Sequence, residues 1–422
     1  MPVISQTIAM LAGCIGVLGS LYCLAETFTV HRLMRLKEFR TASVVATESG
    51  TKLLTLPAHS CVNDNSPAVT IFKPLRNATS DLRRDLETLF AQDYTGPTQI
   101  IFGLHSESDP AKALVDQLRE RHPNVKVVVS PASHGRNSKV TNLLNMVPSA
   151  RHPIFVICDG DTAVPPNWLS DLIRTLQAPG IGLVSCVYSG APERPLFWPI
   201  MSAMGMSYSF LPNAVFAAAT GLEAPCLGAT MAIRQSTLAE VGGFERFADA
   251  LADDYELGLA VRAEGYSAAL LMSVVRHNAG EKRISDFFTH ELRWARTIRM
   301  INPIGYALSA ITHNVGFAAL GVVASPTAVA LAILAFAIGA RFVLQRVVDR
   351  AFACWSGPMW LLPLRDLLSF LVFALAFLTR KVRWGGCVFD TTSSSAFDFS
   401  PTATPFRSAA SRKSRTAGEG SA

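Results

Sequence analysis

The chain has 422 residues, a length that suits two or three structural units; 50% are hydrophobic, 17% are charged and the mean hydropathy is +0.29. Because soluble globular chains carry about 25% charged residues, this composition excludes a chain that is disordered throughout and indicates a membrane protein with a water-facing part. The formal net charge of +6 requires no nucleic-acid partner. The eight cysteines are scattered without zinc-type spacing, which is typical of reduced thiols in a cytosol-facing protein.

An apolar run opens the chain. Residues 1–25 carry no charged side chain before Glu26, and a bilayer span needs roughly 20 residues. Basic residues follow the run rather than precede it, unlike in a secretory signal: they are His31, Arg32, Arg35, Lys37 and Arg40. We therefore expect a retained transmembrane anchor over 1–30, with its amino end outside and the following chain in the cytosol. Residues 31–64 are expected to be a linker.

The middle of the chain alternates between two kinds of pattern. Short apolar runs bounded by breakers predict strands at 69–72, 99–104, 125–130, 154–158 and 182–188. Helical patterns lie between them, near 80–92, 109–121, 137–148 and 166–177. This alternation predicts an α/β domain over 65–300 with a mostly parallel sheet covered on both faces. Ligands of such sheets bind beyond the carboxyl ends of the strands, so polar residues directly after strands are candidates for a site.

Acidic residues occupy such positions. The strand at 154–158 runs directly into Asp159-Gly160-Asp161, and two carboxylates at a strand end can hold Mg²⁺ or Mn²⁺ against a diphosphate. A plain Asp-Gly turn is the alternative. Asp109 follows the strand at 99–104, where helix capping is the alternative. Asp253 and Asp254 open a helical stretch, where solvated first-turn acids would be the ordinary explanation.

A second apolar block, residues 300–340, carries no formal charge. At about 1.5 Å per residue it is too long for one helical span, and it predicts two spans folded back at Ser325-Pro326. Basic residues then mark the expected return to the cytosol: Arg341, Arg346 and Arg350. Just before the block, arginines recur every three residues from Arg293 to Arg299 beside apolar residues, a pattern that favours a helix lying on the membrane surface.

A third candidate span, residues 357–379, is interrupted by Arg365-Asp366. Charges inside a span are costly and usually face protein or water, so a short re-entrant or interfacial helix is the alternative. We expect the carboxyl-terminal membrane region to cover 301–380 with two or three helices. Residues 392–422 are rich in Ser, Thr, Ala and Arg, and we expect 381–422 to be a largely disordered tail. The sequence does not decide on which side of the membrane this tail lies.

Taken in chain order, short motifs resemble the ceramide glucosyltransferase family, membrane-bound relatives of the processive sugar-polymer synthases. The motifs are Phe72-Lys73-Pro74-Leu75, Asp85-Leu86-Glu87-Thr88-Leu89-Phe90, Gln92-Asp93-Tyr94, Ser108-Asp109-Pro110-Ala111, Lys139-Val140-Thr141-Asn142-Leu143, Ile157-Cys158-Asp159, Val241-Gly242-Gly243, Asp253-Asp254-Tyr255 and Arg293-Trp294. The family pattern is three separated aspartates followed by Gln or Arg, two residues, and Arg-Trp. In this chain His290 departs from that pattern.

The resemblance implies a Rossmann-like nucleotide-sugar-binding domain of the glycosyltransferase A type, facing the cytosol. It implies transfer of one sugar, glucose in the named family, from a UDP-sugar with inversion at the anomeric carbon. The acceptor would be the hydroxyl of a membrane lipid, ceramide in the named family and hopanoids or other lipids in bacterial relatives. The protein would then lie in the inner membrane if it is bacterial.

The resemblance also implies roles for individual residues. Asp254 is expected to be the base that deprotonates the acceptor hydroxyl, and Asp159 with Asp161 to hold the divalent cation. Lys73, Pro74 and Asp109 are expected to contact the nucleotide of the donor. Lys139 and Arg293 are expected to contact its phosphates, and Trp294 is expected to form a flat wall for the sugar or the lipid. His277-Asn278 has two interpretations, a lining of the same site or a structural role.

Residues 197–216 are rich in flexible and aromatic apolar side chains. We expect them to dip into the membrane interface and form the acceptor entrance, with core packing as the alternative. Three rival functions remain open. A processive polysaccharide synthase shares the three aspartates and the Arg-Trp ending, a phosphoprenol sugar transferase would use a phosphate acceptor, and a scaffold or transporter would use the same membrane helices without catalysis.

Overall fold

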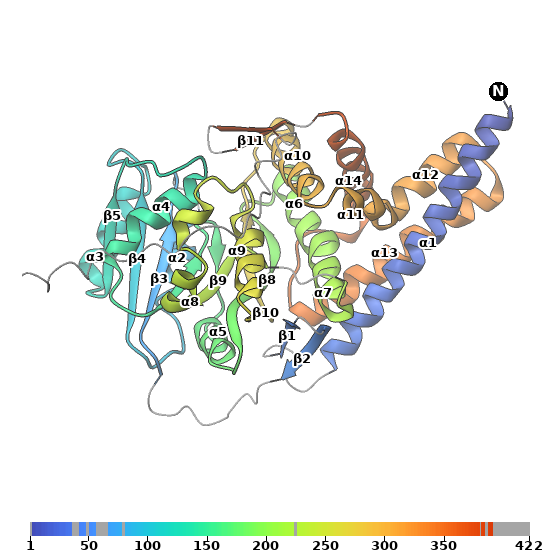
Figure 1. The fold of residues 1–422 in the computed structure, drawn as a ribbon. Coiled ribbons are helices and arrows are strands. Elements are labelled where there is room, and N and C mark those ends of the chain that lie inside the picture. Colours follow the sequence, from blue (N-terminus) through green and yellow to red (C-terminus); the bar gives the residue numbers. More distant parts are fainter. Residues whose placement is uncertain are drawn as a thin grey trace, which may run out of the picture.

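The structure is a computed structural model that describes residues 2–35, 42–47, 50–55, 66–77, 81–222, 226–379, 381–384 and 387–390. One large sheet with its covering helices forms the α/β part of the molecule, on the left of Figure 1. A helical part built around α1 (Pro2–Met34), α12 (Asn314–Ala324) and α13 (Ala328–Phe352) extends away from it on the right. The arrangement thus separates a sheet part from a helical part, and the expected domain boundaries stay a prediction.

The sheet has the strand order β2-β1-β10-β8-β9-β6-β3-β4-β5, in which β1 spans Ala42–Thr47, β2 spans Gly50–Thr55 and β9 spans Thr230–Arg234. The five predicted strands are confirmed as β3 (Val69–Pro74), β4 (Thr98–Leu104), β5 (Val125–Val129), β6 (Ile154–Cys158) and β8 (Ile181–Pro192). Strands β6, β3, β4 and β5 are mutually parallel, and β8 is parallel to β10 (Ser267–Ala279). The α/β class is therefore confirmed, with the parallel strands β6, β3, β4 and β5 arranged as expected for that class.

The expectation of a mostly parallel sheet needs a correction, because the sheet is mixed. Strand β9 (Thr230–Arg234) lies between β6 and β8 and is antiparallel to both. After β8 the chain passes through helices and re-enters the sheet at the edge where β8 ended, which forces the opposite strand direction.

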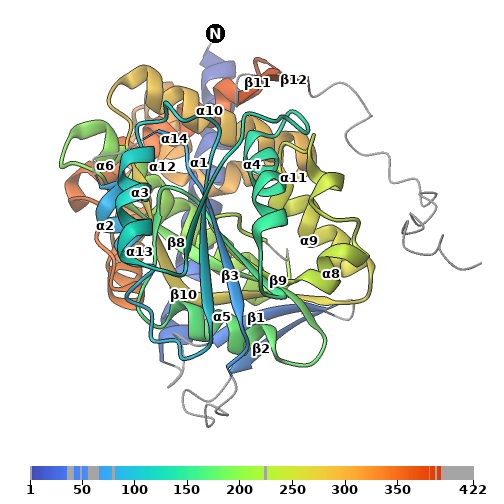
Figure 2. The same cartoon turned by 90° about the vertical axis from the view of Figure 1, so that its left-hand side faces the viewer.

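Two hydrophobic clusters cover the two faces of the sheet. Alternate residues of β3 point to opposite faces, so that Ile71 belongs to one cluster and Phe72 to the other. Helices α3 (Lys112–Arg121) and α5 (Trp168–Leu176) pack on the first face, and α4 (Ser138–Met146), α8 (Gln235–Glu240) and α9 (Asp253–Ala263) on the second. Figure 2 shows α3 and α4 on either side of β3. The predicted helices are thus confirmed, although α2 (Leu82–Glu87) is shorter than expected.

Two segments expected to lack structure contain strands. Within the expected linker 31–64, β1 (Ala42–Thr47) and β2 (Gly50–Thr55) form a hairpin, and β1 pairs antiparallel with β10. The β-branched residues Val44 and Val45 are buried there, which explains why this stretch joins the sheet. Within the expected tail, β11 (Lys381–Trp384) pairs with β12 (Cys387–Asp390). The expected disorder of 391–422 falls outside the described residues.

Three helical stretches of the described chain are long and apolar enough to cross a membrane: Ile4–Met34, Ala328–Phe352 and Met359–Ala376. The expected fold-back at Ser325-Pro326 is confirmed, because α12 ends at Ala324 and α13 begins at Ala328. The first of the two expected spans differs from expectation. The helical segments 303–312 and 314–324 meet at a bend of 69°, so they do not form one straight span. Helix α13 also continues past Arg341, which lies inside the helix rather than at the end that was expected to face the cytosol.

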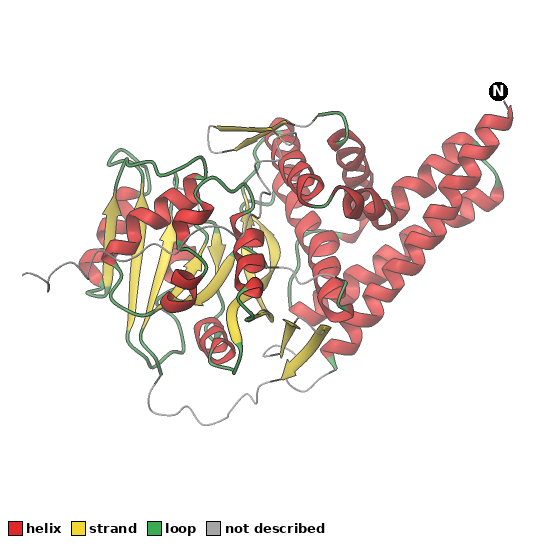
Figure 3. Ribbon diagram, viewed as in Figure 1, coloured by secondary structure: helices red, strands yellow, loops and turns green. Residues whose placement is uncertain are grey.

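The segment 197–216 packs between the sheet and the membrane helices (Figure 3). It forms α6 (Phe197–Gly205), a π-helical turn η3 (Met206–Phe210) and α7 (Leu211–Thr220). Met201, Met204 and Tyr208 are fully buried, so the alternative of core packing describes these residues, and the expectation that the whole segment dips into the interface is wrong. Only the start of α6 is open, where Phe197 is 42% exposed.

Candidate active site

A cavity of about 570 Å³ lies beyond the carboxyl ends of β3 and β6, where the sequence placed a site. Its lining includes Pro74, Lys139, Asp159, Asp161, Tyr188, Phe210, Asp253, Asp254, His277, His290, Arg293 and Trp294. The strand ends and the amino ends of α4 and α9 supply the aspartates and Lys139. Helix α10 (Ile284–Ile301) supplies the wall that carries the Arg-Trp motif.

The loop between β6 and β7 (Thr162–Ala163) holds the two aspartates of the Asp-Gly-Asp motif. The backbone amide of Asp159 donates to the carbonyl of Ala229 at 3.0 Å, and the amide of Thr162 donates to the carbonyl of Asp159 at 3.1 Å. A side chain at Gly160 would approach the carbonyl oxygen of Pro74 to 3.0 Å. A glycine between the acids therefore lets the loop turn against the end of β3, which presents both carboxylates to the cavity.

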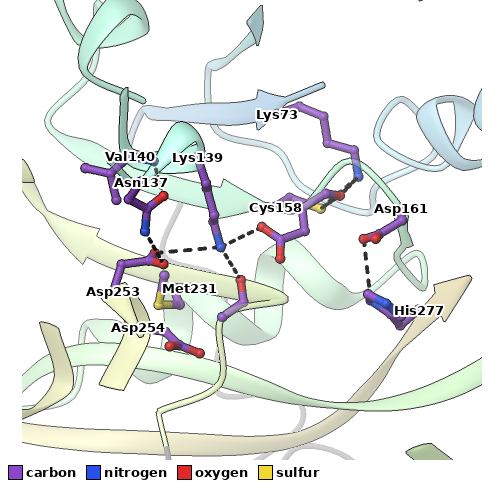
Figure 4. Close-up of polar contacts among 12 residues, drawn as sticks. Lys73, Asn137, Lys139, Val140, Cys158, Asp161, Met231, Asp253, Asp254 and His277 are labelled. Carbon is purple, nitrogen blue, oxygen red and sulfur yellow. Dashed lines mark hydrogen bonds and ion pairs between the residues drawn. The ribbon is translucent and has the colours of Figure 1, made fainter. Parts of the chain in front are cut away.

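Lys73 shapes this loop from beneath and does not line the cavity, contrary to the expected nucleotide contact. Its side chain is fully buried, and its ammonium donates to the carbonyls of Asp159 and Thr162, the latter at 2.7 Å. A third contact reaches Cys158 Sγ at 3.3 Å. Figure 4 shows Lys73 apart from Lys139 and Asp253. Because an ammonium has three donors, these contacts use its whole capacity.

Lys139 lies between acids that come from two distant parts of the chain (Figure 4). Its Nζ is 2.7 Å from Asp159 Oδ1 and 4.0 Å from Asp253 Oδ2, and it donates to the carbonyl of Gly228 at 3.0 Å. Burial alone would lower the pKa of Lys139, but the two carboxylates outweigh it and raise that pKa. The site therefore carries a fixed positive charge at the position expected to meet a phosphate.

Asp253 and Asp254 begin α9, and their environments differ. Asp253 Oδ1 accepts a hydrogen bond from Asn137 Nδ2 at 3.0 Å. Asp254 Oδ1 accepts from the amide of Tyr255 at 2.9 Å, and a side chain at Gly228 would come within 2.7 Å of Asp254 Oδ2. Burial, followed by the negative charge of Asp253, raises the pKa of Asp254 to about 6. Asp254 is thus a carboxylate whose pKa is shifted toward that of a general base.

His277 and Asn278 divide the two roles that the sequence left open for them. His277 lines the cavity, and its Nδ1 lies 3.4 Å from Asp161 Oδ1 (Figure 4). Asn278 is buried, its amide donates to the carbonyl of Asp161 at 2.9 Å, and its side chain donates to Asp85. Asn278 is therefore structural, and it fixes the Asp161 end of the loop.

Helix α10 brings the last motif to the cavity. Burial lowers the pKa of Arg293, although the charges of Asp161 and Asp159 act in the opposite direction. The ring of Trp294 lies 4.6 Å from that of His290 and 6.3 Å from that of Phe210. These contacts give the cavity one wall that combines a cation with aromatic rings, the combination that the sequence suggested for a phosphate and a sugar or lipid.

His290, which departs from the family pattern, has a partner that the sequence did not reveal. Its Nδ1 pairs with a carboxylate oxygen of the buried residue Glu281. Burial acts to raise the pKa of Glu281, but the hydrogen bond and charge of His290 reverse the shift and lower it. Glu281 and His290 are nine residues apart, a spacing that belongs to no known sequence motif. Only the fold shows that the two side chains meet.

Asp109 is the aspartate that the structure does not bring to the cavity lining. Its Oδ2 accepts from the amide of Asn77 at 3.0 Å and its Oδ1 from the amide of Ala111 at 2.9 Å. Asn77 has a φ of 64° and lines the cavity beside Arg76. Asp109 therefore acts on the site indirectly by fixing a strained backbone position. The other two aspartates of the pattern, Asp159 and Asp254, do share the cavity.

The acidic loop fits a divalent cation only in part. Within the described ranges, no group of three or more His, Cys, Asp or Glu side chains is arranged to hold a metal ion. Asp161 Oδ1 is nevertheless buried and without a hydrogen bond, next to Asp159. Two carboxylates with further positions left for phosphate oxygens and water are the donor set that Mg²⁺ or Mn²⁺ takes in substrate-bound sites. The residues present are therefore compatible with a cation that arrives together with a diphosphate.

Comparisons with known proteins agree with this geometry. The model of Glycosyl transferase family 21 matches residues 39–396. Ceramide glucosyltransferase 1 from Caenorhabditis elegans is 26% identical over 235 residues, which are 54% of this chain and 49% of that protein. Beta-monoglucosyldiacylglycerol synthase from Synechocystis sp. is 22% identical over 235 residues, 54% of this chain and 47% of that protein. The chain spans about half the length of the curated relatives it matches.

A solved structure shares the fold. The mannosyltransferase PcManGT from Pyrobaculum calidifontis, in complex with GDP-Man and Mn2+, superposes with a TM-score of 0.51 at 19% identity, covering 89% of this chain and 99% of that one. The glycosyltransferase A type of fold and the resemblance to the ceramide glucosyltransferases are thereby confirmed. The family match covers most of the chain, including the sheet, the Arg-Trp helix and the carboxyl-terminal membrane helices. The chain belongs to glycosyl transferase family 21.

Proposed function

We propose that the protein transfers one sugar, glucose in the first instance, from a UDP-sugar to the hydroxyl of a membrane lipid with inversion at the anomeric carbon. The observation that carries this proposal is the convergence of Asp159, Asp254 and Arg293 on one cavity. The cavity belongs to a family 21 chain whose flanking helices can cross a bilayer. A base, a cation-binding loop and a phosphate-binding guanidinium in one cavity are the parts that inverting transfer needs.

On the acceptor side, Asp254 is the proposed base. Its carboxylate accepts the proton of the lipid hydroxyl as that oxygen forms a bond to the anomeric carbon. The bond between the anomeric carbon and the diphosphate oxygen breaks, and UDP leaves with the bonding electron pair. The raised pKa of about 6 gives Asp254 more driving force for proton uptake than an exposed aspartate would have.

On the donor side, Asp159 and Asp161 are the proposed ligands of Mg²⁺ or Mn²⁺. Such a cation, when bound, offsets the negative charge that develops on the leaving diphosphate. Lys139 and Arg293 place two further positive groups on the cavity wall, and Pro74 lines the side beyond β3 where the nucleotide is proposed to lie. Lys73 and Asp109 support this side without touching the donor, through the Asp159 loop and through Asn77.

The acceptor is proposed to enter along α10. Thr297, Ile298 and Ile301 continue the cavity wall from Trp294, and Ile298 is 51% exposed. The next helix, α11 (Pro303–Leu308), carries Ile304 at 75% and Leu308 at 70% exposure. An apolar path of this kind lets a lipid hydroxyl reach Asp254 while its chains remain in the bilayer, with the site on the cytosolic side. Ceramide or a hopanoid-like lipid fits this description.

The test supplies the purified full-length protein with vesicles that contain ceramide, diacylglycerol or a hopanoid. Each reaction also contains Mn²⁺ and one labelled UDP-sugar: UDP-glucose, UDP-galactose, UDP-glucuronate or UDP-N-acetylglucosamine. We expect one donor and one acceptor class to give a labelled lipid with a single sugar, together with free UDP. A ladder of products would favour a polysaccharide synthase, and no transfer from any donor would contradict the proposal.

A further inference from the structure

Helix α14 (Leu362–Ala376) is apolar, but it contains an arginine and an aspartate side by side that point to different partners. Asp366 accepts two hydrogen bonds from Arg341 of α13, each 2.9 Å long. Arg365 Nη2 donates to Glu291 Oε2 of α10 at 2.8 Å. Both α14 side chains are buried, with Arg365 only 3% exposed. The pair of charges therefore joins two different helices to α14, one in the membrane bundle and one at the cavity.

Helix α10 has few buried anchors. Of its 18 residues, all within the described chain, Phe287 is the one that is fully buried. The guanidinium carbon of Arg365 lies 5.4 Å from the centre of the Phe287 ring, and the same guanidinium pairs with Glu291 one turn further along. One side chain of α14 thus contacts α10 through a cation–π contact and an ion pair.

The packing around Arg365 leaves room for this side chain. A Cβ added at Gly205, the last residue of α6, would lie 1.8 Å from Arg365 Nη2. A glycine inside a helix is less favourable than an alanine, so its presence here has a packing reason. Arg365 also donates from Nη1 to Ser369 Oγ at 2.6 Å, which holds the guanidinium in one orientation.

We propose that Arg365 is a positioning residue that fixes α10 so that Arg293 and Trp294 line the cavity. The membrane helix α14 then sets the geometry of the phosphate-binding wall. Glu291 precedes Arg293 by two residues and Trp294 by three, so a shift of α10 at Glu291 moves the side chains of both residues. What Arg293 and Trp294 contact rests on the proposed function, whereas the placement of α10 does not.

The test measures hydrogen–deuterium exchange of the full chain in lipid nanodiscs, because this readout needs no substrate. In Arg365→Met we expect the amides of 284–301 to exchange about tenfold faster or more, since local opening lowers protection. Gly205→Ala, which keeps both charges but occupies the guanidinium's space, should give the same local effect. The double variant Glu291→Arg/Arg365→Glu restores opposite charges and should return most of the protection.

Two matched controls separate positioning from general loosening of the bundle. Arg341→Met breaks the neighbouring buried ion pair of α14, and Gly339→Ala adds a methyl group to a helical glycine of α13 that has open space around it. We expect neither to change exchange in 284–301. If Arg341→Met loosens α10 as much as Arg365→Met does, or if the charge reversal restores nothing, the proposal is wrong.

Kinetics supply the second readout. If Arg293 and Trp294 are misplaced, the cavity should bind the UDP-sugar more weakly. Arg365→Met should therefore lower kcat/KM for the UDP-sugar about 10–100-fold, mainly by raising KM. Unchanged donor KM together with loosened α10 would overturn the assigned role. A wild-type protein that uses no UDP-sugar would instead contradict the proposed function, and the exchange experiment would still decide the placement of α10.

Discussion

Lys139 Nζ lies 2.7 Å from Asp159 Oδ1, and this contact joins the two halves of the cavity. Asp159 follows strand β6, whereas Lys139 stands at the start of α4 and also faces Asp253 at the start of α9. Without this cation, the acids at the end of β6 and at the start of α9 would repel each other in a buried setting. Lys139 therefore sets the charge balance on which both the proposed cation site and the proposed base depend.

The first expectation concerns pH. Asp254 must be deprotonated to act as a base, and its pKa is raised to about 6 by burial and by Asp253. Activity should therefore be low below pH 6, rise through about pH 6 and level off above it. A profile of kcat/KM against pH measures this rise, which is the acidic limb of the profile. A limb centred near the ordinary pKa of aspartate, about 4, would contradict the assignment.

Two variants should move that limb in opposite directions. Asp253→Asn removes the negative charge that raises the pKa of Asp254, so the limb should shift to lower pH. Lys139→Met removes the positive charge that lowers it, so the limb should shift to higher pH. Shifts in the same direction, or no shift in either variant, would show that another group titrates.

Asp254→Asn should lower kcat about 10²–10⁴-fold, which is the usual contribution of a positioned base. Binding of UDP, measured by calorimetry, should stay close to that of the wild type because Asp254 is not one of the proposed donor contacts. Asp249→Asn is the control, since Asp249 is 65% exposed and its ion pair with Arg136 lies outside the cavity lining. Equal losses in the two variants would contradict a specific role for Asp254.

Removal of divalent cations should abolish turnover and weaken UDP binding, and Mn²⁺ or Mg²⁺ should restore both. Asp161→Asn should raise the Mn²⁺ concentration needed for half-maximal activity, because it removes one of the two proposed carboxylate ligands. A titration of activity against Mn²⁺ measures this. Full activity after exhaustive chelation would show that Lys139 and Arg293 neutralise the diphosphate without a metal.

Lys73→Met should destabilise the protein rather than change donor specificity. The buried carbonyls of Asp159 and Thr162 would each lose the ammonium as a donor, and the Asp159 carbonyl would keep the amide of Thr162. A buried acceptor left without its donor costs about 1–3 kcal/mol. Thermal unfolding of the full chain in detergent should show a clearly lower Tm. Lys126→Met is the control, because Lys126 is an exposed residue of β5. If Lys73→Met keeps the Tm of the wild type and loses only UDP binding, the buried role is wrong.

Ile298→Glu should raise KM for the lipid acceptor while leaving UDP binding unchanged, because it places a charge on the proposed acceptor path. Leu222→Glu serves as the matched control, since Leu222 is 72% exposed two residues beyond the end of α7 and does not line the cavity. Assays with acceptor vesicles of increasing lipid content separate the two variants. If the acceptor KM rises equally in both variants, the lipid acceptor does not enter along α10.

Much of the fold could be predicted because its signals are local. Each parallel strand is a short apolar run bounded by breakers, and both faces of β6 are buried, so the pattern alone identified it. The reversed direction of β9 could not be predicted, since it depends on the path of the chain through α6 and α7. The bend of 69° near His313 was equally invisible in a block without charges.

The site was predictable in its acids and less so in its supporting contacts. Asp159 and Asp254 stand at a strand end and a helix start, positions that a sequence can reveal. Lys73 has its partners 86 and 89 residues away, and Arg365 meets Glu291 at a separation of 74 residues. Such long-range contacts have no spacing rule, so their roles came only from the three-dimensional arrangement.

The anomeric configuration of the product tests the central claim most directly. The purified protein is supplied with UDP-α-glucose, Mn²⁺ and its lipid acceptor, and the extracted glycolipid is analysed by nuclear magnetic resonance. With Asp254 as a single base acting on the lipid hydroxyl, we expect one glucose in a β-linkage. An α-linkage, more than one sugar per lipid, or no glycolipid from any nucleotide sugar would contradict the account.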